Sequence, residues 1–360
     1  MFETLVIEGL GLEELSPRTA SVWFGLALGI GFGTLAFATG FCLRRGLVGA
    51  SSERLSAMTT WLWVLSVALI GTQALGWMGV IEVTEHRLLS AQLPLLQTGL
   101  GGALFGAGMV LTRGCLSRLT VLSGSGNLRA LTVLGVAALV ALATQKGVLA
   151  PLRMALAGYE IEVTRLPQLF TFLPLLITLF LLIRTRLSAP QLVLSALLGV
   201  LVPLGWLGTG LLLQDEFDPI AVDSLSFTGP WADSLFWSVA SSSITAGFGT
   251  GLIGGVILGG LLLSLITRRF QWQGFEHPAQ MGRYLVGGGL MGFGGVLAGG
   301  CTVGAGLSGL AILSTTALFA LAAIITGALI MDRVVLRAVN ARSSGGSGAP
   351  SPKPAPQPAA

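Results

Sequence analysis

The sequence contains few charged residues, and this scarcity excludes most classes of soluble protein. Charged side chains make up 10% of the 360 residues, whereas an ordinary soluble domain carries about 25%. Hydrophobic residues reach 53%, and the mean hydropathy is +0.83. A nucleic-acid-binding protein would need a basic face, and the 20 Lys and Arg residues form no such stripe. The composition therefore predicts a polytopic membrane protein that contacts the lipid bilayer and no nucleic acid.

Residues that bind metals are also scarce. The chain has three cysteines and two histidines, and it contains no CxxC or HxxxH spacing. We therefore expect neither a metal site nor a cofactor. The odd number of widely spaced cysteines argues against a disulfide framework. His86 and His277 lie in polar connections, where we interpret them as solvated loop residues.

Long apolar runs occupy most of the chain. Most of them approach the roughly 20 residues needed to cross a hydrocarbon core. They predict an all-α fold with about nine transmembrane helices, within residues 21–42, 61–81, 94–112, 130–146, 168–183, 191–213, 236–265, 284–300 and 309–331. We expect residues 1–20 to form a short N-terminal lead, residues 21–335 the membrane transport domain, and the Ser-, Gly- and Pro-rich residues 336–360 a disordered tail.

Basic and acidic residues alternate between successive loops, which predicts the orientation of the chain. The loop at residues 214–235 contains acidic residues and no Lys or Arg, whereas residues 147–167 contain both signs and fit neither side clearly. By the positive-inside rule the N-terminus lies outside and the C-terminus in the cytoplasm. Arginines follow the first, third, fifth, seventh and last apolar runs, for example Arg44, Arg113, Arg184, Arg268 and Arg333.

Two glycine-containing motifs recur in the same order along the chain. The sequence GFGT occurs at residues 31–34 and 247–250, and residues 102–126 resemble residues 288–314. This predicts two pseudo-symmetric halves, at about residues 21–146 and 236–332, joined by linking helices at 168–213. The loop charges place the GFGT segments parallel to each other and the longer pair antiparallel. Some glycine-broken runs are therefore expected to be short re-entrant half-helices rather than full spans.

Each of the three cysteines follows glycine closely at a break in an apolar run. Cys42 follows Gly40, Cys115 follows Gly114, and Cys301 follows Gly300. A lone cysteine in a membrane helix is usually a small packing residue, and this interpretation applies to any one of them. Three thiols at equivalent breaks instead favour one shared function, as groups that line a path for a small, soft, sulfur-bearing anion.

Residues beside the thiols could add contacts to such an anion. Thr302 offers a hydroxyl donor, Gly300 and Gly114 leave backbone accessible, and Arg113 carries positive charge. The arginine has a second interpretation, as an ordinary basic residue at a cytoplasmic surface. No His, Asp or Glu lies next to a cysteine in the sequence, so enzymatic catalysis is not expected.

These segments resemble the YeeE/YedE family of membrane proteins, the thiosulfate-transporter (TsuA-like) group. The matching residues are 290–304 (LMGFGGVLAGGCTVG), 105–115 (FGAGMVLTRGC) and 31–46 (GFGTLAFATGFCLRRG), and the resemblance extends from about residue 20 to 335. It implies uptake of thiosulfate or a related sulfur anion across the cytoplasmic membrane of a prokaryote. It also implies an hourglass of nine transmembrane helices plus short re-entrant ones.

The resemblance further implies how the anion moves. Cys42, Cys115 and Cys301, matched by their local motifs, would lie along the central axis and contact the anion in turn through S–H···S hydrogen bonds. Members of the family are often paired with a small cytoplasmic sulfur carrier of the TusA/TsuB type. No such domain is fused within the 360 residues, so a carrier would be a separate protein.

Two other functions remain open from the sequence. One is a membrane sulfurtransferase-like protein, in which a cysteine persulfide passes sulfur to a cytoplasmic carrier. It requires a reactive thiolate beside a basic group, and Arg44 or Arg113 could provide the charge. The other is a purely structural subunit. Three broken membrane helices cost energy, and a structural subunit would gain no function from them.

Overall fold

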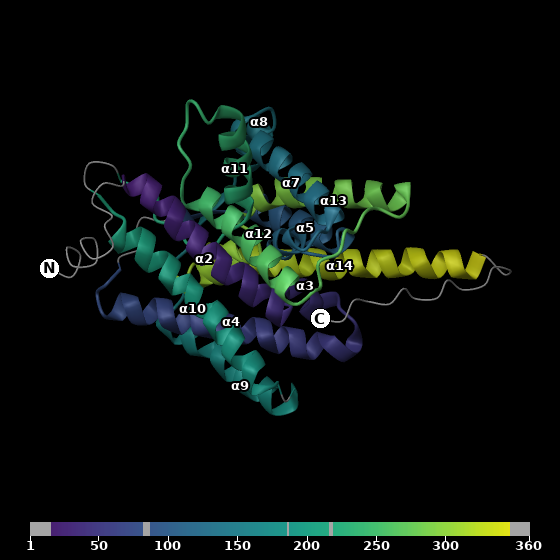
Figure 1. Cartoon of the computed structure of the whole chain (residues 1–360), viewed down its shortest axis with the longest axis horizontal. Helices are drawn as coiled ribbons and strands as arrows, with labels where there is room; N and C mark the ends of the chain where they lie inside the picture. The colour runs from purple at the N-terminus through teal and green to yellow at the C-terminus, as the bar shows by residue number, and fades with distance from the viewer. Residues whose placement is uncertain (1–15, 82–86, 186, 216–218, 346–360) are drawn as a thin grey trace.

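The computed structural model describes residues 16–81, 87–185, 187–215 and 219–345. Within these ranges the chain is almost entirely helical (Figure 1). The first half contains α2 (Pro17–Thr39), α3 (Leu43–Val48), α4 (Ser51–Trp77), η1 (Arg87–Leu89), α5 (Leu95–Leu111), α6 (Leu116–Gly124), α7 (Leu128–Lys146) and α8 (Ala150–Leu156). The remainder contains η2 (Gln168–Phe172), α9 (Leu173–Thr185), α10 (Ala189–Leu207), η3 (Gly208–Leu212), α11 (Thr228–Ala240), α12 (Phe248–Ile266), α13 (Pro278–Leu297), η4 (Gly304–Gly309) and α14 (Thr315–Gly345).

One small sheet lies among the helices of the described residues. Strand β1 (Gln92–Pro94) pairs antiparallel with β2 (Glu160–Glu162), with Leu93 opposite Ile161. This long-range antiparallel pairing ties the start of α5 to the connection between α8 and η2. The connection at 147–167, whose charges fit neither side of the membrane, is therefore a structured segment.

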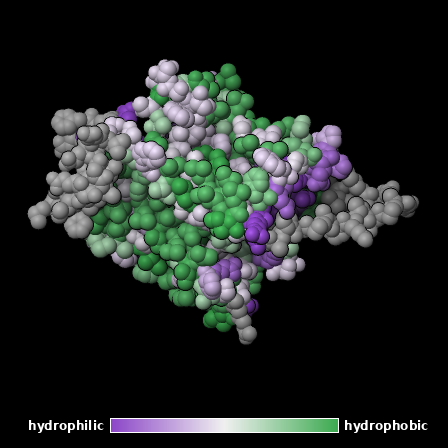
Figure 2. Space-filling model, viewed as in Figure 1, coloured by the Kyte–Doolittle hydropathy of each residue, from purple (hydrophilic) through white to green (hydrophobic). Residues whose placement is uncertain are grey.

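The described residues contain eight helical segments long and apolar enough to cross a membrane. This confirms the predicted class, an all-α polytopic membrane protein. The segments are Pro17–Val48, Ser51–Trp77, Leu95–Gly124, Leu128–Lys146, Gln168–Thr185, Ala189–Leu212, Phe248–Ile266 and Thr315–Arg337. Figure 2 shows apolar surface over most of the visible body, with hydrophilic residues gathered toward the right, around the start of α13.

The structure corrects the predicted crossing at residues 236–265. That run is divided into α11, which ends at Ala240, and α12, which begins at Phe248. The intervening residues 241–247 read SSSITAG, and serine and glycine favour turns and helix starts over helix interiors. At 13 residues, α11 reaches only about 20 Å and is too short to cross the bilayer alone.

The eighth predicted crossing, at residues 284–300, corresponds to α13. This helix begins earlier than expected, at Pro278, because proline suits the first turn of a helix. It is not among the eight apolar segments, since its first turns contain Gln280 and Arg283. It packs against both α5 and α7.

Helices α2 and α12, which contain the two GFGT motifs, pack backbone to backbone. A Cβ on Gly29 would lie 2.4 Å from the carbonyl oxygen of Leu252, and one on Gly255 would lie 2.2 Å from that of Leu26. Contacts advance in the same direction along both helices, from Gly25 with Phe248 to Gly33 with Val256. The two helices are therefore parallel, which is the relative direction that the loop charges predict.

Helices α5 and α13 belong to the longer repeated pair, and they are antiparallel. Gly101 faces Leu297 and Gly294, whereas Gly108 faces Gly287. This is again the predicted relative direction. On its other side α5 packs against α14, where a Cβ on Gly106 would lie 2.0 Å from the carbonyl oxygen of Ile324. Small residues thus bring three helices to the closest approach that backbones allow.

The structure describes only part of the predicted N-terminal lead and part of the predicted C-terminal tail. Residues 1–15 of the predicted lead lie outside the described residues, and α2 already begins at Pro17. At the other end α14 continues to Gly345, so residues 336–345 of the predicted disordered tail are helical. Arg, Ala and Leu in this stretch favour helix, which allows the membrane helix to extend beyond its apolar part. Residues 346–360 lie outside the described range.

The glycine contacts between α2 and α12 lead to a test of packing. Replacing Gly29 with alanine forces the two backbones apart, and we expect it to lower the free energy of unfolding by about 1–3 kcal/mol. Thermal unfolding of the purified protein in detergent measures this. Gly289→Ala is the matched control, because nothing lies within 4 Å of its added Cβ. Equal midpoints for Gly29→Ala and Gly289→Ala would contradict the close packing.

Candidate functional site

The three cysteines occupy breaks that are built in the same way. In each, a long helix ends, a residue adopts positive φ, and the cysteine follows two positions later. The positive-φ residues are Gly40 (63°), Arg113 (60°) and Gly299 (72°). The helices that end there are α2, α5 and α13, and the short helices that follow are α3, α6 and η4. The breaks between the long and the short helices are the interruptions that the glycine-cysteine motifs predict.

Local hydrogen bonds close the broken helices. The N–H of Phe41 donates to the carbonyl oxygen of Ala36 (3.2 Å), and the N–H of Gly114 donates to that of Met109 (3.1 Å). The hydroxyl of Thr112 lies 2.9 Å from the carbonyl oxygen of Gly114 and donates to it. Such closure satisfies backbone groups that a helix end leaves without partners, which is essential inside a bilayer.

All three thiols are free and buried. Their exposed fractions are 4% for Cys42, 2% for Cys115 and 0% for Cys301. Cys42 and Cys115 are also the residues that immediately precede α3 and α6. The thiols therefore lie inside the protein, each held by backbone that the break has fixed.

Side-chain contacts connect the three breaks. The side chains of Cys42 and Cys115 interact with each other, and Cys115 also interacts with the side chain of Thr302. Cys115 Sγ forms a hydrogen bond with Ser117 Oγ at 3.2 Å. Cys301 precedes Thr302 and accepts a hydrogen bond from the N–H of Gly304 at 3.3 Å. The order of groups is therefore Cys301 and Thr302, then Cys115, then Cys42.

Positive charge lies beside this row of thiols. Arg118, in α6, interacts electrostatically with both Cys42 and Cys115. Its guanidinium donates to the carbonyl oxygen of Ala36 at 3.3 Å, which fixes it against the end of α2. A guanidinium held in this position attracts an anion that comes close to the thiols.

A cavity of about 380 Å³, the Ser226 cavity, lies at one end of the row. Gly299 and Gly300, next to Cys301, line it together with Ser226 and Thr228. The hydroxyls of Ser226 and Thr228 are buried and have no hydrogen-bond partner. The charged residues on the lining are Arg153, Asp223 and Asp233. Two hydroxyl donors thus remain available to a molecule in this cavity.

A second cavity, of about 500 Å³, includes Cys42 and is called the Cys42 cavity here. Gly40, Arg45 and Glu53 also line it. Phe248 lines the Ser226 cavity, and its backbone packs on Gly25 in α2. From Gly25 to Gly40, α2 rises by about 22 Å at 1.5 Å per residue. The two cavities therefore lie at opposite ends of α2, with the buried thiols between them.

The residues that the sequence predicts as supporting contacts have different positions. Gly300 lines the Ser226 cavity, and Thr302 is buried against Cys115. Gly114 is buried beside Leu119 and Arg118 and helps to shape the second break. Arg113 is exposed and adopts the left-handed conformation, and it lies near Arg44 rather than beside a thiol.

Ser226 and Thr228 were not predicted from the sequence. They lie in residues 224–230 (SLSFTGP), at the end of the acidic loop. Small hydroxyl side chains before an apolar helix resemble an ordinary helix start, so their sequence gives little indication of a site. Across the described residues, no group of three or more His, Cys, Asp or Glu side chains could hold a metal ion.

The protein has helices long enough to cross the membrane, and a row of buried polar groups lies between two cavities. This arrangement is typical of a multi-pass membrane protein of the transporter class. Comparison with protein families gives the same class. The family described as sulphur transport matches residues 38–191 and again residues 184–330. The chain belongs to this family.

Two characterised relatives extend over most of the chain. It is 26% identical over 348 residues to the thiosulfate transporter TsuA of Spirochaeta thermophila, covering 88% of this chain and 99% of the relative. It is 24% identical over 305 residues to the thiosulfate transporter TsuA of Escherichia coli K12, covering 74% of this chain and 83% of the relative.

The contact between Cys42 and Cys115 can be tested without any substrate. Hg²⁺ is a soft ion that bridges two close thiolates, so we expect one tightly held Hg²⁺ in the wild type and in Cys301→Ala. Cys42→Ala and Cys115→Ala should each lose this tight binding. Native mass spectrometry after removal of excess metal by a weak thiol competitor measures it. Equal retention by all four proteins would show that these two thiols are apart.

Proposed function

We propose that this chain carries thiosulfate, or a closely related sulfur anion, across the membrane along the row of thiols. The observation that supports this most directly is the interaction between the free, buried thiols of Cys42 and Cys115, with Cys301 next to Thr302, between two cavities. The thiosulfate transporters among its relatives support the choice of anion. The proposed activity is transport, in which no bond of the substrate breaks.

The chemistry of thiosulfate suits these groups. Its terminal sulfur is soft and polarizable and accepts weak hydrogen bonds from thiols, whereas its oxygens accept stronger ones from hydroxyls. In this scheme the oxygens bind Ser226 and Thr228 in the Ser226 cavity. The terminal sulfur then contacts Cys301, Cys115 and Cys42 in turn. Weak contacts at several successive sites allow the anion to enter and to leave again.

Burying a dianion is costly unless charge or hydrogen bonds compensate for the lost water. Arg118 beside Cys42 and Cys115 supplies charge at the most buried part of the path. The start of α6, directly after Cys115, adds the partial positive charge of a helix N-terminus. Arg44 adds a second positive charge beside Cys42, and together these charges offset part of the cost of burying the anion.

The loop charges assign a direction to this path. The Ser226 cavity includes Asp223 from the acidic loop, which we place outside, and the Cys42 cavity includes Arg45 from a basic loop, which we place in the cytoplasm. We propose import across the cytoplasmic membrane of a prokaryote. A separate carrier of the TusA/TsuB type would then receive the anion near the Cys42 cavity.

The alternative, sulfur transfer through a cysteine persulfide, has less support. A persulfide forms readily when a base or cation generates the thiolate. Arg118 and Arg44 supply positive charge beside Cys42, but the groups that contact the thiols, such as Ser117, Thr302 and the N–H of Gly304, include no base. The lack of a general base is therefore the argument against transfer. Mass spectrometry of the protein after exposure to thiosulfate separates the two: an added sulfur on a cysteine would favour transfer.

The role of the thiols can be tested by uptake. We expect Cys115→Ala and Cys301→Ala to abolish uptake of radiolabelled thiosulfate by cells that lack their own importers, because each removes one S–H donor from the path. The variants should retain wild-type abundance in the membrane. Wild-type uptake by either variant at equal abundance would show that its thiol serves only packing.

The hydroxyls of the Ser226 cavity lead to a separate test. A neutral hydrogen bond contributes about 1 kcal/mol, so we expect Ser226→Ala and Thr228→Val each to raise the KM of uptake about fivefold. The matched control is Ser234→Ala in α11, since the Ser234 hydroxyl already donates to the carbonyl oxygen of Pro230 at 2.6 Å. A KM that changes equally in all three variants would assign the effect to α11 rather than to the cavity.

A further inference from the structure

The Cys42 cavity contains an ion pair directly beside the last thiol of the path. Arg45, in α3, and Glu53, in the first turn of α4, both line the cavity together with Cys42. Arg45 Nη2 lies 2.9 Å from Glu53 Oε2. An anion that leaves Cys42 for this cavity therefore meets a guanidinium that a carboxylate already engages.

Arg45 is also tied to the break that holds Cys42. Its Nη1 donates to the carbonyl oxygen of Gly40 at 3.2 Å. A Cβ on Gly40 would lie 2.4 Å from the same Nη1, so glycine at this position leaves the space that the guanidinium occupies. The guanidinium is thus fixed two residues from Cys42, and its remaining N–H groups can bind an oxyanion while the contact to Gly40 persists.

The ion pair is accessible enough to exchange partners. The side chains of Arg45 and Glu53 are 28% and 50% exposed, and pairs with this exposure contribute little net stability. A thiosulfate dianion carries more charge than the carboxylate and can engage the planar guanidinium through two oxygens. The hydroxyl of Thr60, also on the cavity lining, already donates to the carbonyl oxygen of Ser56. Among these lining groups, Arg45 is the strongest candidate for binding the anion.

We propose that Arg45 forms an anion subsite at the Cys42 end of the path, and that Glu53 competes with the anion for it. Glu53 lowers the affinity of the subsite so that the anion is released instead of remaining on Arg45. The carboxylate returns to Arg45 when the anion leaves. This inference rests on the proposed function, because it names the group that receives the anion after Cys42.

Equilibrium binding of radiolabelled thiosulfate to the purified full-length protein tests the competition. Glu53→Gln removes the competing charge and keeps the side-chain size, and we expect it to bind thiosulfate about fivefold more tightly than the wild type. Uptake by the same variant should show a lower KM together with a lower maximal rate. Loss of a merely structural ion pair would not tighten binding. Glu53→Ala provides a second variant with the same expected direction.

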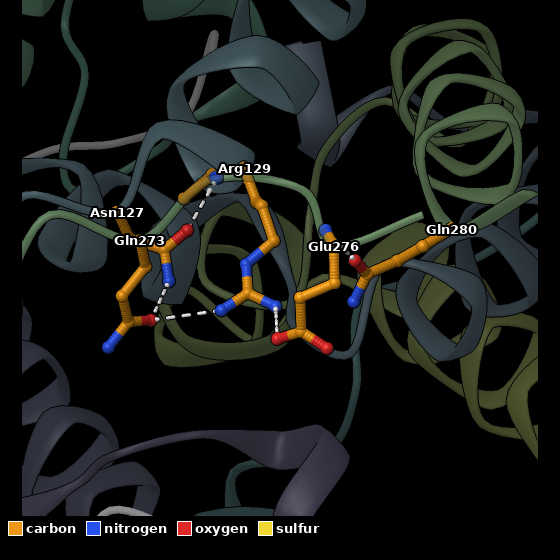
Figure 3. A network of polar contacts seen from close by, with 6 residues as sticks. Asn127, Arg129, Gln273, Glu276 and Gln280 are labelled. Carbon is orange, nitrogen blue, oxygen red and sulfur yellow. Dashed lines mark hydrogen bonds and ion pairs between the residues drawn. The ribbon is translucent and has the colours of Figure 1, made fainter. Parts of the chain in front are cut away.

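Arg45→Gln completes a double-mutant cycle. We expect it to weaken binding, and we expect Glu53→Gln to have no further effect when Arg45 is already replaced. The matched control is Glu276→Gln, which breaks the Arg129–Glu276 pair (3.5 Å) outside the cavity (Figure 3). That control should bind thiosulfate as the wild type does.

The outcomes separate this inference from the proposed function. Thiosulfate binding by the wild type, with equal or weaker binding by Glu53→Gln, would overturn the competition alone. Tighter binding by Glu53→Gln and by Glu276→Gln alike would also overturn it, since the effect would then follow from net charge. Absence of thiosulfate binding in every protein would overturn both the competition and the proposed function.

Discussion

The arrangement of the site depends on one constraint, that a helix interrupted within a bilayer must satisfy its broken backbone inside the protein. The three interruptions meet it in the same way, with a residue at positive φ two positions before each cysteine. Gly40 and Gly299 adopt this conformation at little cost, whereas Arg113 does so at about 1 kcal/mol. Because the interruptions are closed by local hydrogen bonds, the cysteines are held by rigid backbone even though they lie outside the long helices.

Close packing of glycine-rich helices then determines how far apart the interruptions lie. Helices α2 and α12 contact each other through Gly29 and Gly255, and α5 contacts α13 through Gly101 and Gly294. Backbones in direct contact leave little room for the helices to shift, so the ends of these helices are fixed relative to one another. A larger residue in these interfaces would move the interruptions apart, and the contact between Cys42 and Cys115 would be lost. The glycines of the helices and the thiols of the path therefore form one structural unit.

The sequence predicts the local part of this arrangement and misses the long-range part. A glycine next to a cysteine at the end of an apolar run indicates an interruption, and Cys42, Cys115 and Cys301 all follow one. Loop charges predict the relative directions of α5 and α13, which lie side by side in the fold (Figure 1). The contacts of Cys115 with Cys42 and with Thr302 join segments far apart in the chain, and no local pattern encodes them. The same holds for the unpaired hydroxyls of Ser226 and Thr228, and for α11 and α12, which hydropathy alone merges into one span.

The two ends of the path differ in charge, and this difference bears on direction. Asp223 and Asp233 line the Ser226 cavity together with a single arginine, Arg153. In the Cys42 cavity Arg45 is balanced by Glu53, and Arg118 lies beside Cys42 and Cys115. The electrostatic potential therefore becomes more favourable to an anion from the first cavity to the second. Salt screens exposed charges beyond about 8–10 Å, but a partly buried guanidinium such as that of Arg118 is screened less. In the proposed scheme, an anion that passes the carboxylates is attracted along the thiols toward the arginines. Attraction alone would retain the anion there, so import as proposed requires a weakened final site, and the pairing of Arg45 with Glu53 is suited to that role.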